Sequence, residues 1–342
     1  GYTLAIADGV YVHHDGSQTF LSHGIDTQKL LRDNLELYRG KWGDEEANRY
    51  QPATLPTHQR TQNPSVFSPT HLPAPVPAPA PAVPRISLTM IVKNEEHYLP
   101  ECLASVEGIF DEVVIIDTGS TDRTKEIINQ HGAKLGEFPW IDSFAQARNA
   151  ALDLATGDWI FWLDADDRVL PQERTKLQAL LNRIRSGEVS HAQVLKCRCL
   201  PAPGGQHTVV DHVRLFPKKQ GVRWDYRVHE QILPSLRKAG VGVDWSDVVI
   251  THVGYAPPEA RDQKLARDLR LLELDLQEKP GDPFILFNLA SAHHEAGRYH
   301  EALQCAQASI QASHPSDSIV RKLYALAAQC QTKLGDTSGA LN

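Results

Sequence analysis

Three carboxylates follow a short apolar run in the middle of the sequence. The run 159–163 leads directly into Asp164, Asp166 and Asp167. Carboxylates this crowded repel one another unless a divalent cation neutralises them, and Mg²⁺ and Mn²⁺ prefer oxygen ligands. Diphosphate oxygens would complete the shell of such a cation, which would stabilise charge on a departing nucleoside diphosphate. Alternatively, the same residues form a polar turn and an N-cap before a helix at 172–181.

Buried strands that alternate with helices are expected to position these carboxylates. Strand patterns occur at 86–92, 112–116 and 159–163, and helical spacing follows the first two. This alternation predicts a mainly parallel, Rossmann-like α/β sheet. Asp117 and Asp164 each stand at the carboxyl end of a predicted strand, where such sheets bind ligands.

The order and content of four motifs resemble those of family 2 glycosyltransferases over roughly residues 85–255. The matching segments are 88–96 (LTMIVKNEE), 115–122 (IIDTGSTD), 147–149 (ARN) and 158–166 (DWIFWLDAD). The resemblance implies a GT-A nucleotide-diphospho-sugar transferase fold. It also implies transfer of a sugar from a nucleotide diphosphate donor, with a leaning towards UDP and an inverting displacement.

The resemblance also implies roles for individual residues. Asp117 would contact the base, Asp164 would lie towards the ribose, and Asp166 would bind a divalent cation, Mn²⁺ or Mg²⁺. The residues implied to bind the nucleotide-sugar are Thr89, Asn94, Glu95, Asp117, Arg148, Asp164 and Ala165. Structural interpretations remain open, because a carboxylate at the end of a strand can open a turn and Arg148 can be a surface cation in a helix.

A later histidine is implied to complete the metal site. His252 ends a strand-like run, where a lone histidine is usually a core or surface residue. GT-A enzymes often carry a metal-binding histidine at the end of the domain. The resemblance therefore makes His252 a ligand of the cation together with Asp164 and Asp166.

The base that would accept the proton of the acceptor is assigned to Glu230. Many relatives carry an acidic residue or a histidine that faces the acceptor in this part of the chain, and a carboxylate can act as a general base there. Glu230 could instead form a structural ion pair with Arg223 or Arg227. Asp211 and His229 are rival bases.

A proline-rich segment divides the chain. Alternating proline and alanine within 52–84 can form neither a helix nor a central strand, which predicts an extended linker. The preceding residues 1–51 resemble the tail of another family 2 glycosyltransferase domain. Their histidine-containing run, followed by a leucine-rich helical pattern, echoes the region after His252, and His14 would be the counterpart of that residue.

The transferase domain is assigned to residues 85–256 and a helical region to 257–342. The segment 297–303 (GRYHEAL) recurs loosely as 335–341 (GDTSGAL), an offset close to that of a tetratricopeptide repeat. Such repeats bind partner proteins in a concave groove, so a protein partner is expected, and it could be the acceptor. The acceptor could equally be a peptide or a glycan. Both ends of the sequence are expected to be truncated.

Composition excludes several classes of protein. The 35 lysines and arginines against 42 aspartates and glutamates give no basic field for nucleic acid. Apolar runs fall well short of the roughly 20 residues that span a bilayer, and the start lacks a signal-peptide pattern. Five scattered cysteines favour a reducing, cytoplasmic location. Cys197 and Cys199 could be half of a metal site, but alternate strand positions explain them equally well.

Two other functions compete with sugar transfer. A nucleotidyltransferase also uses carboxylate-held Mg²⁺, but it usually has a glycine-rich basic loop, whereas residues 93–96 (KNEE) are acidic and lack glycine. The other is a non-catalytic transferase-like platform whose helical repeats bind a partner protein. Asp117, Asp164 and Asp166 are all present, which speaks against a transferase domain that has lost its catalytic residues.

Overall fold

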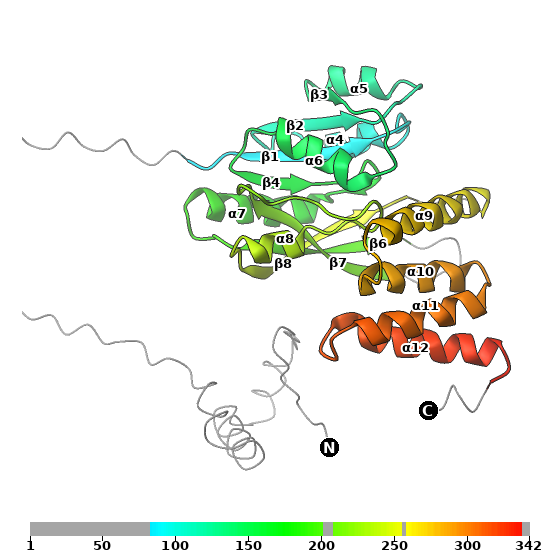
Figure 1. The fold of residues 1–342 in the computed structure, drawn as a ribbon. Helices are drawn as coiled ribbons and strands as arrows, with labels where there is room; N and C mark the ends of the chain where they lie inside the picture. Colours follow the sequence, from blue (N-terminus) through cyan, green and yellow to red (C-terminus); the bar gives the residue numbers. More distant parts are fainter. Residues whose placement is uncertain (1–82, 201–207, 255–257, 337–342) are drawn as a thin grey trace, which may run out of the picture. The chain divides into compact units, whose positions relative to one another are not determined.

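The computed structural model describes residues 83–200, 208–254 and 258–336 (Figure 1). The predictions for residues 1–51, including His14, and for nearly all of the 52–84 linker lie outside the described residues.

A single eight-stranded sheet forms the core of the region before residue 255. The strands are β1 (Ile86–Val92), β2 (Glu112–Asp117), β3 (Lys134–Glu137), β4 (Trp159–Trp162), β5 (Asp167–Arg168), β6 (Ala192–Cys199), β7 (Thr208–Pro217) and β8 (Val243–His252). They lie in the order β3-β2-β1-β4-β7-β6-β8-β5. The helices interspersed with them are α4 (Leu99–Ser105), α5 (Thr124–Gln130), α6 (Phe144–Leu154), α7 (Pro171–Arg185) and α8 (Leu233–Lys238).

The sheet is parallel in one half and mixed in the other. Strands β3, β2, β1 and β4 pair in parallel, as the alternation of strand and helix predicts. Strand β7 then pairs antiparallel with both β4 and β6, while β8 runs parallel to β6 and antiparallel to β5. The predicted α/β class is confirmed, and the mainly parallel arrangement holds only for the first half. The strand pattern of β7 is hidden in the sequence because Asp, His and Arg interrupt its apolar residues.

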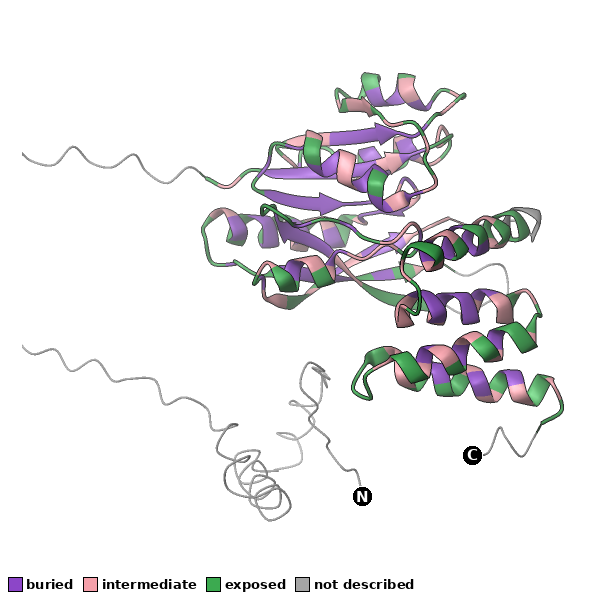
Figure 2. Cartoon of the chain, in the orientation of Figure 1, coloured by how far each residue is buried: buried purple, intermediate pink, exposed green. Residues whose placement is uncertain are grey.

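Alternate side chains of the strands enter two apolar layers. Trp159 and Phe161 of β4 pack in the layer that contains residues of α4 and α7, whereas Ile160 and Trp162 pack with residues of α6 and α8. This follows from the two-residue period of a strand. The central strands are consequently buried on both faces (Figure 2).

Four consecutive helices follow the sheet. They are α9 (Pro258–Glu278), α10 (Pro283–Glu295), α11 (Tyr299–Ala312) and α12 (Ser318–Lys333). Each packs against the next, through a cluster around Ile285 and Leu289 and another around Ala306 and Leu323. This serial packing fits the predicted repeat region. In the part of the chain that the structure describes, no helix is both long and apolar enough to cross a membrane.

Replacing Phe161 by alanine should show how much the central strand contributes to stability. Phe161 is fully buried and stacks on Phe110 with 5.1 Å between the ring centroids. We expect Phe161→Ala to lower the free energy of unfolding by about 3–5 kcal/mol, because it leaves a cavity in the core. Urea unfolding followed by circular dichroism measures the change.

Tyr324→Ala is the control, since that side chain on α12 is 60% exposed. It should change the free energy of unfolding by no more than about 0.5 kcal/mol. Equal losses in the two variants would contradict the assignment of Phe161 to the core.

Candidate functional site

The carboxyl ends of β2, β4 and β8 bring the candidate residues to one edge of the sheet. Strand β1 lies between β2 and β4 in parallel register, with Val92 opposite Asp117 and Thr89 opposite Trp162. At the far end of the strand order, β5 pairs with β8, which sets Asp167 directly opposite His252. Residues from distant parts of the sequence therefore meet here, as expected for a ligand site in an α/β sheet.

Asp117 is buried at the end of β2, and only one of its two carboxylate oxygens accepts hydrogen bonds from described residues. Its Oδ1 accepts hydrogen bonds from the backbone N–H groups of Gly119 and Ser120 at 3.0 and 2.9 Å. Its Oδ2 is buried without a hydrogen-bond partner among the residues that the structure describes. Buried polar atoms are nearly always paired, so this oxygen is suited to a donor from a ligand.

Asn94 fastens the turn after β1 to the turn after β2. Its backbone has a φ of 57°, a left-handed conformation that asparagine tolerates better than most residues. Its Oδ1 accepts a hydrogen bond from the Thr121 N–H at 2.8 Å, and its own N–H donates to Ser120 Oγ at 2.8 Å. The next helix, α4, begins at Leu99, beyond the turn that contains Asn94.

Glu95 belongs electrostatically to the acidic group. Its backbone N–H donates to Thr124 Oγ1 at 2.7 Å, which fixes the residue beside the site. Burial, followed by the negative charges of Asp166 and Asp164, raises the pKa of Glu95 to about 7. A cation bound among these carboxylates would favour its ionised form.

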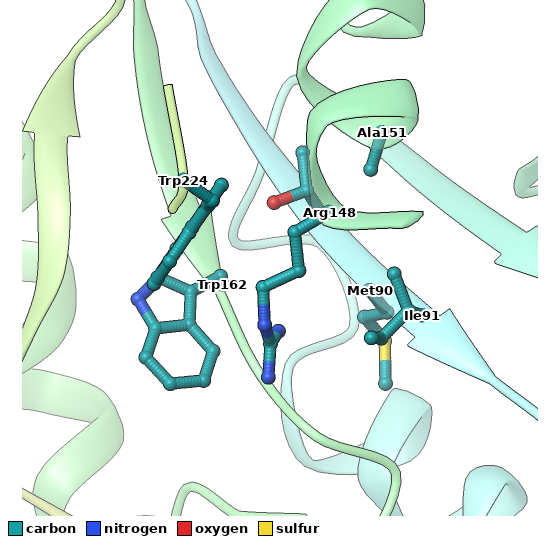
Figure 3. A pocket seen from close by; sticks show the side chains of 7 residues that line it. Met90, Ile91, Arg148, Ala151, Trp162 and Trp224 are labelled. Atoms are coloured by element: carbon teal, nitrogen blue, oxygen red, sulfur yellow. The ribbon is translucent and has the colours of Figure 1, made fainter. Parts of the chain in front are cut away.

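Arg148 is a buried cation at the centre of the site. It lies on α6 with 8% of its surface exposed, so it is not the surface cation that the sequence left open. Its Nη2 donates to Asp164 Oδ1 at 2.9 Å and its Nε to Glu230 Oε1 at 2.6 Å. The guanidinium carbon lies 4.3 Å from the ring centroid of Trp162 and 5.2 Å from that of Trp224 (Figure 3).

These groups line a small pocket on the sheet. Its lining residues are Thr89, Met90, Ile91, Arg148, Ala151, Trp162 and Trp224 (Figure 3). Thr89 is buried there, and its Oγ1 donates to the carbonyl of Phe161 at 3.4 Å. Burial disfavours the charged guanidinium of Arg148, but the charges of Asp164 and Glu230 outweigh it and raise its pKa.

Asp166, Asp167 and His252 form the group best suited to a metal ion. One ligand atom of each lies within 4.8 Å of the others. His252 Nδ1 is 3.1 Å from Asp167 Oδ1 and 3.3 Å from Asp166 Oδ1. Asp164, which the resemblance also placed on the metal, lies outside this group, with its carboxylate paired to Arg148.

Gly254 leaves room beside this group. A Cβ atom added to Gly254 would lie 1.9 Å from Asp166 Oδ2 and 3.2 Å from His252 Nε2. Any other residue at this position would therefore displace the Asp166 carboxylate. Burial, and then the charges of Asp164 and Asp167, raise the pKa of Asp166 despite the opposing influence of His252. Both features fit a site that accepts a cation.

A buried arginine supports the acidic motif from within the sheet. Arg214 on β7 is 2% exposed, and its Nη1 donates to Asp167 Oδ2 at 2.8 Å. The same oxygen accepts the Asp164 backbone N–H at 2.9 Å, so Asp167 fixes the turn of the motif. Sequence reasoning missed Arg214, although an arginine next to the apolar end of a strand-like run was a usable signal.

The structure brings Glu230, rather than its rivals, to the centre of the site. Asp211 and His229 are exposed. The alternative ion pairs of Glu230 do not form either, because Arg223 pairs with Asp153 and Arg227 with Glu278.

His212 is a further titratable group that sequence reasoning missed. It lies on β7 with its ring centroid 5.9 Å from that of Trp162. Burial, followed by the positive charge of Arg214, lowers the pKa of His212 to about 4. His212 is therefore a neutral imidazole at neutral pH.

The two cysteines considered for a metal site occupy alternate positions of β6. Both therefore lie on the same face of the strand, with Cys197 buried and Cys199, at the end of the strand, half-buried. The sulfur of Cys197 contacts Arg214 Nη2 at 3.7 Å. All five cysteines are free.

The chain is similar to known proteins in family, sequence and structure. The model of the family described as "Glycosyl transferase family 2" matches residues 87–228. A TPR repeat-containing protein of Synechococcus elongatus is 31% identical over 268 residues, which is 76% of this chain and 65% of that protein. The SPbeta prophage-derived glycosyltransferase SunS of Bacillus subtilis is 26% identical over 235 residues, covering 66% of this chain and 53% of SunS.

The chain thus spans between half and two thirds of the length of these two relatives. Among solved structures, TarS of S. aureus in complex with UDP-GlcNAc matches with a TM-score of 0.45 and 15% identity, over 75% of this chain and 89% of that one.

Removing Arg214 should deprive a buried carboxylate of its guanidinium partner. We expect Arg214→Met to lower the free energy of unfolding by about 3–5 kcal/mol, because Asp167 would lose its cationic partner inside the sheet. Urea unfolding followed by tryptophan fluorescence measures this. The double variant Arg214→Met/Asp167→Asn should regain part of the loss, since it also removes the charge that Arg214 pairs with. A double variant no more stable than the single one would contradict this explanation.

Proposed function

We propose that this chain, whose residues 87–228 belong to glycosyl transferase family 2, transfers a sugar from a nucleoside diphosphate donor to an acceptor not yet identified. UDP is the proposed nucleotide, and the proposed displacement inverts the configuration of the sugar. A divalent cation, Mn²⁺ or Mg²⁺, is the proposed cofactor.

The unpaired carboxylate oxygen of Asp117 is the observation that carries this proposal. It is buried at the same sheet edge as the acidic motif, with no donor among the described residues. Uracil presents an N–H group between two carbonyls and can supply that donor. A nucleobase on Asp117 would direct the rest of the nucleotide along the edge towards Asp164 and Asp166, the order that the family resemblance implies.

The residues present suit a divalent cation. Asp166 and His252 would hold it, with Asp167 Oδ1 close by, and Gly254 leaves the space that the Asp166 carboxylate needs. When bound, the cation would neutralise the diphosphate and stabilise the charge of the departing nucleoside diphosphate. Asp164, held by Arg148, would remain available to the ribose through its second oxygen.

Glu230 is the proposed general base. Arg148 holds its Oε1 at 2.6 Å, while no described residue donates a hydrogen bond to its Oε2. This oxygen can take the proton of the acceptor hydroxyl as the acceptor oxygen bonds to the anomeric carbon. The bond from that carbon to the diphosphate breaks on the opposite face, which inverts the sugar.

Nucleotide binding should depend on both the metal and Gly254. Calorimetric titration of UDP, GDP and dTDP into the full chain should show binding of UDP with Mn²⁺ and much weaker binding without it. Asp166→Ala removes a proposed metal ligand, and Gly254→Ala displaces the same carboxylate. Each variant should weaken Mn²⁺-dependent binding of UDP by at least about tenfold. The exposed variant Tyr324→Ala should bind like the parent protein. Binding of none of the three nucleotides, with or without Mn²⁺, would refute the proposal and favour a non-catalytic platform.

Glu230→Gln separates the base from the binding site. Glutamine keeps an oxygen that can accept the Arg148 hydrogen bond, so affinity for UDP with Mn²⁺ should stay the same. Release of UDP from UDP-glucose or UDP-N-acetylglucosamine, with water as the acceptor, should fall by about 100-fold or more. Unchanged release would show that Glu230 is not the base, and His212→Gln would then be the next variant to test.

A further inference from the structure

We infer that the C-terminal helices position the Arg148–Glu230 pair, and that Asp275 on α9 is the main positioning residue. The catalytic consequence rests on the proposed transferase function, whereas the structural coupling does not.

The segment that carries Glu230 is a strained loop closed at its base. Asp225 and Gln231 exchange two backbone hydrogen bonds of 3.0 Å. Between them, Tyr226 and His229 adopt φ angles of 68° and 56°, in the left-handed region that residues with side chains avoid. Two such residues within four positions need fixed surroundings to keep the loop in one conformation.

Helices α9 and α10 supply those surroundings. The backbone N–H of Arg227 donates to Asp275 Oδ2 at 2.8 Å, and Asp275 is 2% exposed. The hydroxyl of Tyr226 donates to Asp282 Oδ2 at 3.2 Å, and its ring lies 5.0 Å from that of Phe284. Each of these contacts joins the loop to one of the two helices.

Apolar packing continues the same attachment. Val228 is buried in a cluster with Leu269, Leu272 and Ile285. Three consecutive loop residues, 226–228, are thus held by the helices immediately before the loop turns inward to Glu230.

The helix that carries Arg148 is attached to α9 as well. Arg270 on α9 donates two hydrogen bonds, of 2.8 and 2.6 Å, to the carboxylate of Asp142. The carbonyl of Asp142 accepts a further bond from Arg227 Nη1 at 3.0 Å. The backbone N–H of Phe144, the first residue of α6, donates to the Arg227 carbonyl at 2.8 Å, and Arg148 lies about one turn further along α6.

Both partners of the Arg148–Glu230 pair are therefore connected to α9. Their 2.6 Å contact leaves little tolerance for movement of the loop, and small displacements of a reacting group lower turnover strongly. Apolar contacts alone would serve to attach the helices. Asp275 instead keeps a carboxylate buried that accepts the Arg227 N–H and lies 3.8 Å from Arg227 Nε, although this burial raises its pKa. That use of a buried charge fits positioning of the loop.

The test uses the full chain with Asp275→Ala and the conservative Asp275→Asn. In Asp275→Ala, amide hydrogen exchange in 225–231 should become about tenfold faster, because the Arg227 N–H loses its acceptor. Release of UDP from UDP-glucose should fall by about tenfold, while affinity for UDP with Mn²⁺ should change by less than about twofold. Asparagine retains an acceptor oxygen and should restore most of both properties.

Leu323→Ala is the matched control, because Leu323 is fully buried on α12 and belongs to a different cluster. It should lower the thermal midpoint without changing exchange in 225–231 or UDP release. If Asp275→Ala does not fold, Arg270→Ala tests the α6 side by the same readouts in 142–148, since the Arg270 side chain is about half exposed.

Unchanged exchange in 225–231 of Asp275→Ala would overturn the positioning role. Faster exchange with unchanged UDP release would overturn its catalytic consequence. If the parent protein bound no nucleotide and released no UDP, the transferase proposal would fail with its catalytic consequence. Exchange would still decide whether Asp275 positions the loop.

Discussion

Three carboxylates meet at one edge of the sheet, and the fold must hold their charges together without neutralising all of them. Two buried guanidinium groups each pair with one of these carboxylates. Arg148 pairs with Asp164, and Arg214 pairs with Asp167. Asp166 has neither partner, and its pKa is raised by burial and by its acidic neighbours. The motif is thus rigid on both sides of the one carboxylate best placed to receive a cation.

The two arginines come from the two different halves of the sheet. Arg148 arrives on α6, within the alternating strand and helix half, and Arg214 on β7, the first strand that departs from parallel pairing. Because β7 pairs with β4, it lies beside the strand that delivers the acidic motif. The same mixed half brings β8 against β5 and so sets His252 opposite Asp167. The mixed half of the sheet therefore supplies residues that complete the site at the ends of the parallel strands.

Sequence reasoning recovered what depends on local pattern. The α/β class and the run of C-terminal helices are confirmed, and residues 87–228 match the family 2 model, because strand ends, motif order and helical period are all visible in neighbouring residues. The partners of those residues were not visible. Asp167 and Arg214 are 47 positions apart, and their contact depends on the register of β7 rather than on any motif. The pairing of Arg148 with Glu230 likewise spans 82 positions.

The boundary of the family match bears on how the site is built. It ends at Val228, the residue that packs into the α9 and α10 cluster, two positions before Glu230. His252 and Gly254 also lie beyond it. The matched segment therefore contains the groups proposed to bind the donor, whereas the proposed base and one proposed metal ligand lie beyond it. Since α9 also holds the Glu230 loop through Asp275, the helices and the proposed acceptor side of the site form one mechanical unit. A change in α9 would then act directly on Arg148 and Glu230, the pair that this helix holds in place.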